Sequence, residues 1–216
     1  MSGFPMEFWH NRWATEQIGW HKPEFNDLMV KHWPNLHLPH HAEVLVPMCG
    51  KSLDMVWLSE QGHNIVGLEL VEQAVHSFFK ERELVPEQRN TGRHVHFTCP
   101  PFSIVQGDLF ELEPNTVQAD AWYDRAAMIA LPESRREAYV DQLRVQTKPG
   151  AVGLLITLTY PQEEMTGPPY AVHDDDVHRL FTSGFEVEQL ERIVLEDERG
   201  RGLSSITSSV FKITRT

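Results

Sequence analysis

The chain has little cysteine, no long apolar run and no basic leader. Its two cysteines, Cys49 and Cys99, are far apart and have no second Cys or His at metal-ligand spacing, so neither a disulfide framework nor a zinc site is indicated. No stretch of about 18 apolar residues predicts a membrane-spanning helix, and the N-terminus lacks the pattern of a secretory signal. We therefore expect free thiols, no metal and a soluble, cytoplasmic protein.

Positive charge is also in short supply. Nineteen Lys and Arg stand against 31 Asp and Glu, a formal net charge of -12, so the long-range field repels phosphate backbones and anionic lipid headgroups. We expect a monomer that binds neither nucleic acid nor membrane. His37, His40 and His41 lie close together, but in a Pro-rich stretch without nearby carboxylates, and are interpreted as a solvated loop.

Strand-like apolar runs alternate with helical periodicity along most of the chain, which is typical of a sheet covered by helices on both faces. We expect an α/β, Rossmann-like fold with a seven-stranded, mainly parallel sheet and a C-terminal antiparallel hairpin. Because no repeat or linker divides the sequence, residues 1–216 are predicted to form one domain, with 1–40 as an N-terminal helical lid and 41–216 as the core. The expected strands are 43–48, 64–68, 94–97, 102–106, 119–124, 151–160, 185–194 and 205–213, and the expected helices are 52–61, 71–84, 133–146 and 175–181.

The first forty residues concentrate large apolar side chains ahead of the first strand: Phe8, Trp9, Trp13, Ile18 and Trp20. We expect these apolar side chains to be buried against another part of the protein or against a ligand. One interpretation is a helix packed on a face of the sheet, and the other is a lid over a ligand at the sheet edge, where open sheets bind their ligands. The sequence alone does not separate the two.

The stretch from Val44 to Leu70 has the order strand, turn, helix, strand, with Gly50 in the turn and Glu69 at the tip of the second strand. This order is typical of nucleotide binding, where a glycine turn approaches the ligand and an acidic residue accepts hydrogen bonds from ribose hydroxyls. A dinucleotide site would need G-x-G-x-x-G, and this loop has a single glycine. The pattern therefore favours a cofactor with adenosine but no pyrophosphate, such as S-adenosylmethionine.

Two further strand ends carry polar residues. Asp108 and Leu109 follow the strand at 102–106, where an adenine ring would lie, although Asp108 is equally explained as a residue that caps the next turn. Arg125 follows the strand at 119–124 and either holds an anionic group or forms a structural ion pair with Asp124 or another carboxylate.

Four motifs stand in a characteristic order: FWHNRW followed by IGWH at 8–21, VPMCGKSLDMVWL at 46–58, VGLEL at 66–70 and YDRAAMIALP at 123–132. Together they resemble the thiopurine S-methyltransferase family, more its bacterial than its animal branch, over nearly the whole chain. The resemblance implies S-adenosylmethionine as cofactor and S-methylation of thiopurines or related aromatic or heterocyclic thiols, with a role in detoxification.

The resemblance also implies roles for individual residues. The substrate side would be formed by Trp20, where relatives often carry Phe, by Arg125, and by a second arginine at Arg199, for which Arg201 competes. Arg125 is the expected catalytic residue, because it can favour the anionic form of the acceptor sulfur, and no catalytic His is nominated. The cofactor side would be formed by Trp9, Trp13, Met48, where relatives often have Leu, Gly50, Glu69, Asp108, Leu109 and Arg125.

Other functions remain open at this point. The acceptor can instead be a selenium or tellurium species or another small thiol, because a fold does not fix its substrate. A non-catalytic adenosine-binding module and an NAD-dependent oxidoreductase use related folds, although the single glycine of the loop argues against the latter.

Overall fold

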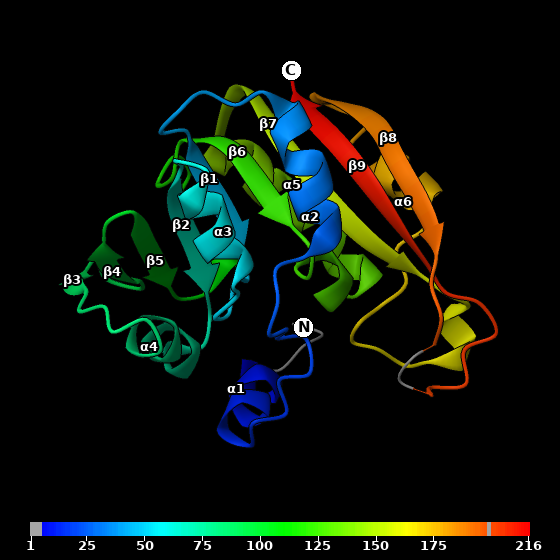
Figure 1. Ribbon diagram of the computed structural model, residues 1–216, viewed down its shortest axis with the longest axis horizontal. Coiled ribbons are helices and arrows are strands. Elements are labelled where there is room, and N and C mark those ends of the chain that lie inside the picture. Colours follow the sequence, from blue (N-terminus) through cyan, green and yellow to red (C-terminus); the bar gives the residue numbers. More distant parts are fainter. Residues whose placement is uncertain (1–5, 198–199) are drawn as a thin grey trace.

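The computed structural model describes residues 6–197 and 200–216. Its helices and strands alternate as expected for an α/β protein (Figure 1). The helices are α1 Met6–Ala14, α2 Asp27–His32, α3 Asp54–Glu60, α4 Glu72–Lys80, α5 Glu133–Gln146 and α6 Asp174–Leu180. The strands are β1 Glu43–Pro47, β2 Asn64–Glu69, β3 Glu87–Asn90, β4 Val95–Cys99, β5 Phe102–Gln106, β6 Ala119–Asp124, β7 Thr147–Thr159, β8 Phe185–Val194 and β9 Thr207–Arg215.

The strands form one sheet in the order β3-β4-β5-β2-β1-β6-β7-β9-β8. The neighbours β5, β2, β1, β6 and β7 run parallel, and the C-terminal pair β8 and β9 is antiparallel, as predicted. The predicted number of strands was wrong, because the described part of the chain has nine rather than seven. At the β5 edge, β4 corresponds to the expected strand at 94–97, whereas β3 was not expected, and both strands pair in antiparallel fashion.

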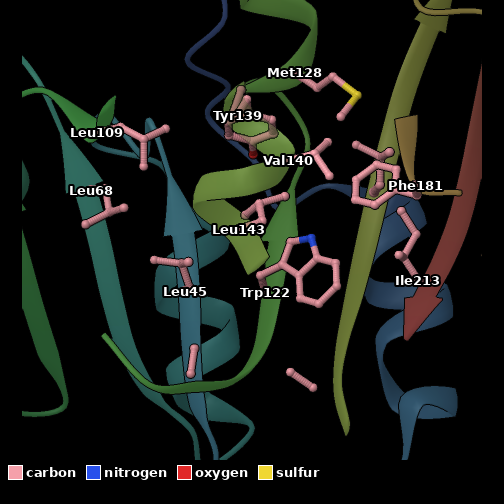
Figure 2. Packing of buried hydrophobic residues seen from close by; sticks show 14 of the residues in the cluster. Leu45, Leu68, Leu109, Trp122, Met128, Tyr139, Val140, Leu143, Phe181 and Ile213 are labelled. Atoms are coloured by element: carbon pink, nitrogen blue, oxygen red, sulfur yellow. The ribbon is translucent and has the colours of Figure 1, made fainter. Parts of the chain in front are cut away.

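Side chains that alternate along the central strands bury both faces of the sheet. On one face, α5 and α6 pack over Leu45, Leu68 and Trp122, and Figure 2 shows Leu143 of α5 near the Trp122 indole. On the other face, α2, α3 and α4 pack over Val44, Ile65 and their neighbours. Burial on both faces explains why these strands are continuous apolar runs.

A glycine in β7 makes room for the largest of these side chains. A Cβ atom on Gly153 would lie 1.9 Å from the Trp122 ring, so no larger residue fits at this position without displacing the indole. Trp122 has no exposed surface, and it contacts Phe185 edge to face with ring centroids 6.0 Å apart. Sequence spacing alone does not reveal this pairing.

The N-terminal forty residues divide into two parts that lie in different places. The second part packs on the sheet, because Met29, Trp33 and Leu36 are buried in the core with α3 and α4. The first part lies elsewhere: Figure 1 shows α1 beyond the arrowheads of β1, β2 and β6, where it contacts α4. The packed-helix interpretation therefore describes the second part, and a lid role for the first part stays a prediction.

Candidate functional site

The parallel strands bring the predicted residues to one edge of the sheet. Gly50 follows β1, Glu69 ends β2, Asp108 follows β5 and Arg125 follows β6. Parallel strands end at the same edge, which is where ligands bind in open α/β sheets. The loops after β1 and β6 line one pocket, whose wall includes Trp20, Met48, Gly50 and Arg125 among the predicted residues.

The loop after β1 is tied to the end of β2. The backbone N–H of Gly50 donates a 2.7 Å hydrogen bond to Oε2 of Glu69, and that of Val71 donates a 2.8 Å hydrogen bond to Oε1. Gly50 has a φ of +54°, and a Cβ atom there would lie 3.3 Å from the Trp13 ring. Both the backbone conformation and the neighbouring indole therefore favour glycine.

The carboxylate of Glu69 is buried, with 7% of the residue exposed. Burial raises its pKa, and hydrogen bonds from the backbone of Val71, Gly50 and Leu70 oppose the increase. Each oxygen keeps a lone pair beyond its backbone partner, so the carboxylate can still accept hydrogen bonds from a ligand.

The loop after β5 lies next to Glu69, because the backbone N–H of Gly107 donates to the Glu69 carbonyl oxygen at 2.9 Å. Asp108 is half-buried and caps the following 3-10 helix, where its Oδ1 accepts a 2.9 Å hydrogen bond from the Phe110 N–H. The capping interpretation of Asp108 is thus correct for Oδ1, and Oδ2 remains for another partner. Leu109 is buried, with 6% exposed, and contributes to the core as well as to this edge.

The aromatic residues of the N-terminal segment form a cluster over this edge. The Trp20 ring lies edge to face against Trp9 and Trp13, with centroids 5.3 and 6.3 Å away. Trp13 is 5% exposed and packs with Val71 and Ala74 at the start of α4. The pocket below this cluster is partly open to solvent, and Trp20 forms part of its wall.

Arg125 does not pair with Asp124. Its Nε lies 2.8 Å from Oδ2 of Asp54 in an ion pair whose N–H direction falls outside hydrogen-bond geometry. Asp124 points the other way: it accepts hydrogen bonds from the backbone of Ala127 and Met128 and, at 2.7 Å, from the Tyr139 hydroxyl. Arg125 therefore forms an ion pair with a carboxylate other than Asp124, and its role toward an anionic ligand stays a prediction.

Asp54 and His21 are among the residues of the pocket wall that sequence reasoning missed. Asp54 begins α3, and its partners come from distant parts of the chain, so no local pattern predicts them. His21 has a buried Nδ1 without a hydrogen-bond partner in the described residues. Burial, followed by the positive charge of Lys51, lowers the pKa of His21. The only available signal was its place in the IGWH motif.

The second substrate-side arginine remains a prediction. Arg199 lies outside the described residues. Arg201, the competing residue, donates from Nε to Oδ1 of Asp197 at 3.1 Å within its own loop. Among residues 6–197 and 200–216, no group of three or more His, Cys, Asp and Glu side chains is arranged to hold a metal ion, and no helix is long and apolar enough to cross a membrane.

Comparison of sequences finds one family over the chain. The family model described as thiopurine S-methyltransferase matches residues 4–216. A thiopurine S-methyltransferase of Shewanella pealeana is 45% identical over 216 residues, covering 96% of this chain and 97% of the relative. One of Xanthomonas campestris is 41% identical over 214 residues, covering 97% and 98%.

Comparison of structures finds the same fold in distant proteins. A Burkholderia thailandensis 1,6-didemethyltoxoflavin N1-methyltransferase, solved with that compound and S-adenosylhomocysteine, has a TM-score of 0.69 at 13% identity and covers 98% of this chain and 87% of its own. A Synechocystis magnesium protoporphyrin IX methyltransferase, solved with S-adenosylhomocysteine, has a TM-score of 0.67 at 13% identity, covering 98% and 100%. At this identity the likeness concerns the fold alone.

Proposed function

This chain belongs to the thiopurine S-methyltransferase family, and on that premise we propose that it methylates the sulfur of a thiopurine or a related aromatic or heterocyclic thiol. It is an S-adenosylmethionine-dependent methyltransferase. The proposal includes Arg125 as the residue that holds the acceptor, and a cytoplasmic monomer as the working form.

The edge formed by β1, β2 and β5 suits this cofactor. A glycine loop approaches a buried carboxylate, Glu69, and the loop has no second glycine that would seat a pyrophosphate. When bound, S-adenosylmethionine supplies a methyl group on a positively charged sulfur. Glu69 would accept hydrogen bonds from the ribose, Asp108 through Oδ2 from the adenine amine, and the apolar walls would come from Trp9, Trp13, Met48 and Leu109.

The acceptor would lie between Trp20 and Arg125, which line the same pocket. An indole offers a flat apolar surface to a purine ring, and a guanidinium offers parallel donors to an anionic sulfur and the ring nitrogens. A positive group beside a thiol favours its ionised form, so Arg125 lowers the need for a general base. The tryptophan cluster would limit the access of water to the bound acceptor.

The transfer itself needs no covalent enzyme intermediate. Bound S-adenosylmethionine would supply a methyl carbon to an electron pair of the acceptor sulfur, with the electrons of the broken bond kept by the donor sulfur. Arg125 would hold the acceptor sulfur in its ionised form, after its proton is lost to solvent. The protein residues contribute position, charge and exclusion of water.

The single observation that carries the proposal is the pocket between the loops after β1 and β6, where the half-buried Arg125 guanidinium faces the same space as Trp20 and Met48. The side chain of Arg125 is 19% exposed, so part of it is accessible to a small ligand.

The test is methyl transfer to 6-mercaptopurine by Arg125→Ala and Arg125→Lys at saturating cofactor. We expect kcat/KM to fall at least about tenfold in both, because a desolvated charge contact is lost or loses its planar fork. Arg192→Ala, which removes an exposed arginine of β8, serves as the control. Full activity of Arg125→Ala would remove its proposed role, and transfer to selenium species or simple thiols alone would move the acceptor away from thiopurines.

A further inference from the structure

Asp54 is the most deeply buried carboxylate at this edge, with 1% of the residue exposed. Its Oδ2 accepts a 3.1 Å hydrogen bond from the Tyr123 hydroxyl and lies 2.8 Å from Nε of Arg125. Its Oδ1 accepts a 2.9 Å hydrogen bond from the backbone N–H of Asn26. A buried charge is tolerated when it is paired and hydrogen-bonded in this way, and each partner fixes the carboxylate in one orientation.

Each partner of Asp54 belongs to a different part of the site. Tyr123 is the penultimate residue of β6, two positions before Arg125 in the chain, and its ring lies edge to face against Trp33. Burial and the nearby Asp54 charge raise the pKa of Tyr123, so its hydroxyl stays protonated and remains a donor. Asn26 caps α2 and lies between the two parts of the N-terminal segment. Asp54 therefore connects β6, the N-terminal segment and the guanidinium.

The contact on Nε determines which side of the guanidinium is left for a ligand. The ion pair with Asp54 is made at Nε, and within the described residues no hydrogen bond or ion pair from Nη1 or Nη2 is found. The edge that carries Nη1 and Nη2 presents two parallel N–H donors, an arrangement that matches two acceptors joined through one carbon atom.

We propose that Asp54 is a positioning residue, which orients Arg125 so that its Nη edge selects acceptors with a ring nitrogen beside the carbon that bears the sulfur. This inference rests on the proposed function and adds the substrate feature that the site recognises. In the ionised form, the N–C–S unit of such a heterocycle offers nitrogen and sulfur as neighbouring acceptors, as a carboxylate offers two oxygens. A thiol without that nitrogen offers the fork a single acceptor.

Two isomers isolate this feature: 2-mercaptopyridine has the nitrogen beside the C–S carbon, and 4-mercaptopyridine has it across the ring. The wild-type protein is expected to prefer the 2-isomer in kcat/KM. Asp54→Asn, which keeps the shape but removes the charge, is expected to reduce that preference about tenfold, the effect of a lost charge-assisted contact. Asp54→Glu is expected to restore part of it. Asp27→Asn, in the exposed first turn of α2, is the matched control.

A second readout separates a positioning role of Asp54 from a purely structural role. Asp54→Asn should leave the affinity for S-adenosylhomocysteine within about twofold, but shift the NMR signal of the Arg125 Nε–H, which is assigned by its loss in Arg125→Lys. If Asp54→Asn does not fold, Tyr123→Phe removes one hydrogen bond from the carboxylate and is expected to reduce the preference in the same direction, but less.

An equal loss of activity toward both isomers, or no preference in the wild type, would overturn the proposal, as would an unchanged Nε–H signal. If the proposed function itself is wrong, the experiments give a different result. In that case the wild type transfers methyl to neither isomer nor to a thiopurine, while the NMR signal still reports whether Asp54 orients Arg125.

Discussion

The backbone N–H of Gly50 donates a 2.7 Å hydrogen bond to Oε2 of Glu69, which joins the loop after β1 to the tip of β2. One carboxylate thus shapes the loop and faces the expected ribose. We predict that Glu69→Gln weakens the binding of S-adenosylhomocysteine about 10- to 100-fold, because hydrogen bonds to a charged group contribute roughly 1.5–3 kcal/mol. Isothermal titration calorimetry measures this, with Glu72→Gln in the exposed first turn of α4 as control. Equal affinity of the two variants would remove Glu69 from the cofactor site.

Gly50→Ala should weaken cofactor binding by more than the strain of its backbone conformation explains. Its φ of +54° costs an alanine about 1–2 kcal/mol, and the added Cβ atom would lie 3.3 Å from the Trp13 ring. Gly150→Ala is the matched control, because Gly150 has a φ of +82° but no atom within 4 Å of its Cβ position. We expect both variants to lose stability in urea unfolding and only Gly50→Ala to lose cofactor affinity. Loss of affinity in both, or in neither, would contradict this account.

The two parts of the N-terminal segment should respond differently to substitution. Trp20→Ala is expected to raise the KM for the acceptor several-fold with little change in Tm, because Trp20 is half-buried in the pocket wall. Trp33→Phe is expected to lower stability by about 1–3 kcal/mol without affecting the KM, because Trp33 donates to the buried His63 at 3.2 Å, and the histidine would lose its partner. Thermal unfolding and steady-state kinetics on both variants test this division. A reversed pattern would mean that the first part supports the fold and the second covers the site.

The pH dependence of stability should carry a contribution from Asp124. Burial raises its pKa to about 6, against the hydrogen bonds from Tyr139, Met128 and Ala127. A raised folded-state pKa favours the folded state fully below the unfolded value near 3.8, and that contribution is lost as pH rises through about 6. Asp124→Asn removes the titrating group. Between about pH 4 and pH 7, urea unfolding should show the wild type losing stability relative to the variant as pH rises, and parallel curves would contradict the raised pKa.

Much of the fold could be predicted because the central strands are buried on both faces. Burial makes β1, β2, β6 and β7 continuous apolar runs, and the helices between them have a clear periodicity, so their order follows from the pattern. The edge strand β3 has no such signal. Its four residues, 87–90, are polar and exposed, and it forms a strand only because β4 provides hydrogen-bond partners.

The site residues also divide into those that could be predicted from the sequence and those that could not. Gly50 and Glu69 could be placed because strand, turn, helix and strand follow one another within a short stretch of sequence. The Asp54 and Arg125 ion pair could not, because it joins the start of α3 to the end of β6 and depends on how the sheet aligns them. Local patterns identify the loops at the sheet edge, and the three-dimensional structure determines which side chains meet there.

The most direct test of the central claim is a calorimetric titration with S-adenosylhomocysteine, followed in the same preparation by transfer of labelled methyl from S-adenosylmethionine to 6-mercaptopurine. We predict binding at a single site and labelled 6-methylmercaptopurine as product, with the transfer strongly reduced in Arg125→Lys. Binding without transfer to 6-mercaptopurine would contradict the proposed acceptor, and absence of binding would contradict the cofactor site itself.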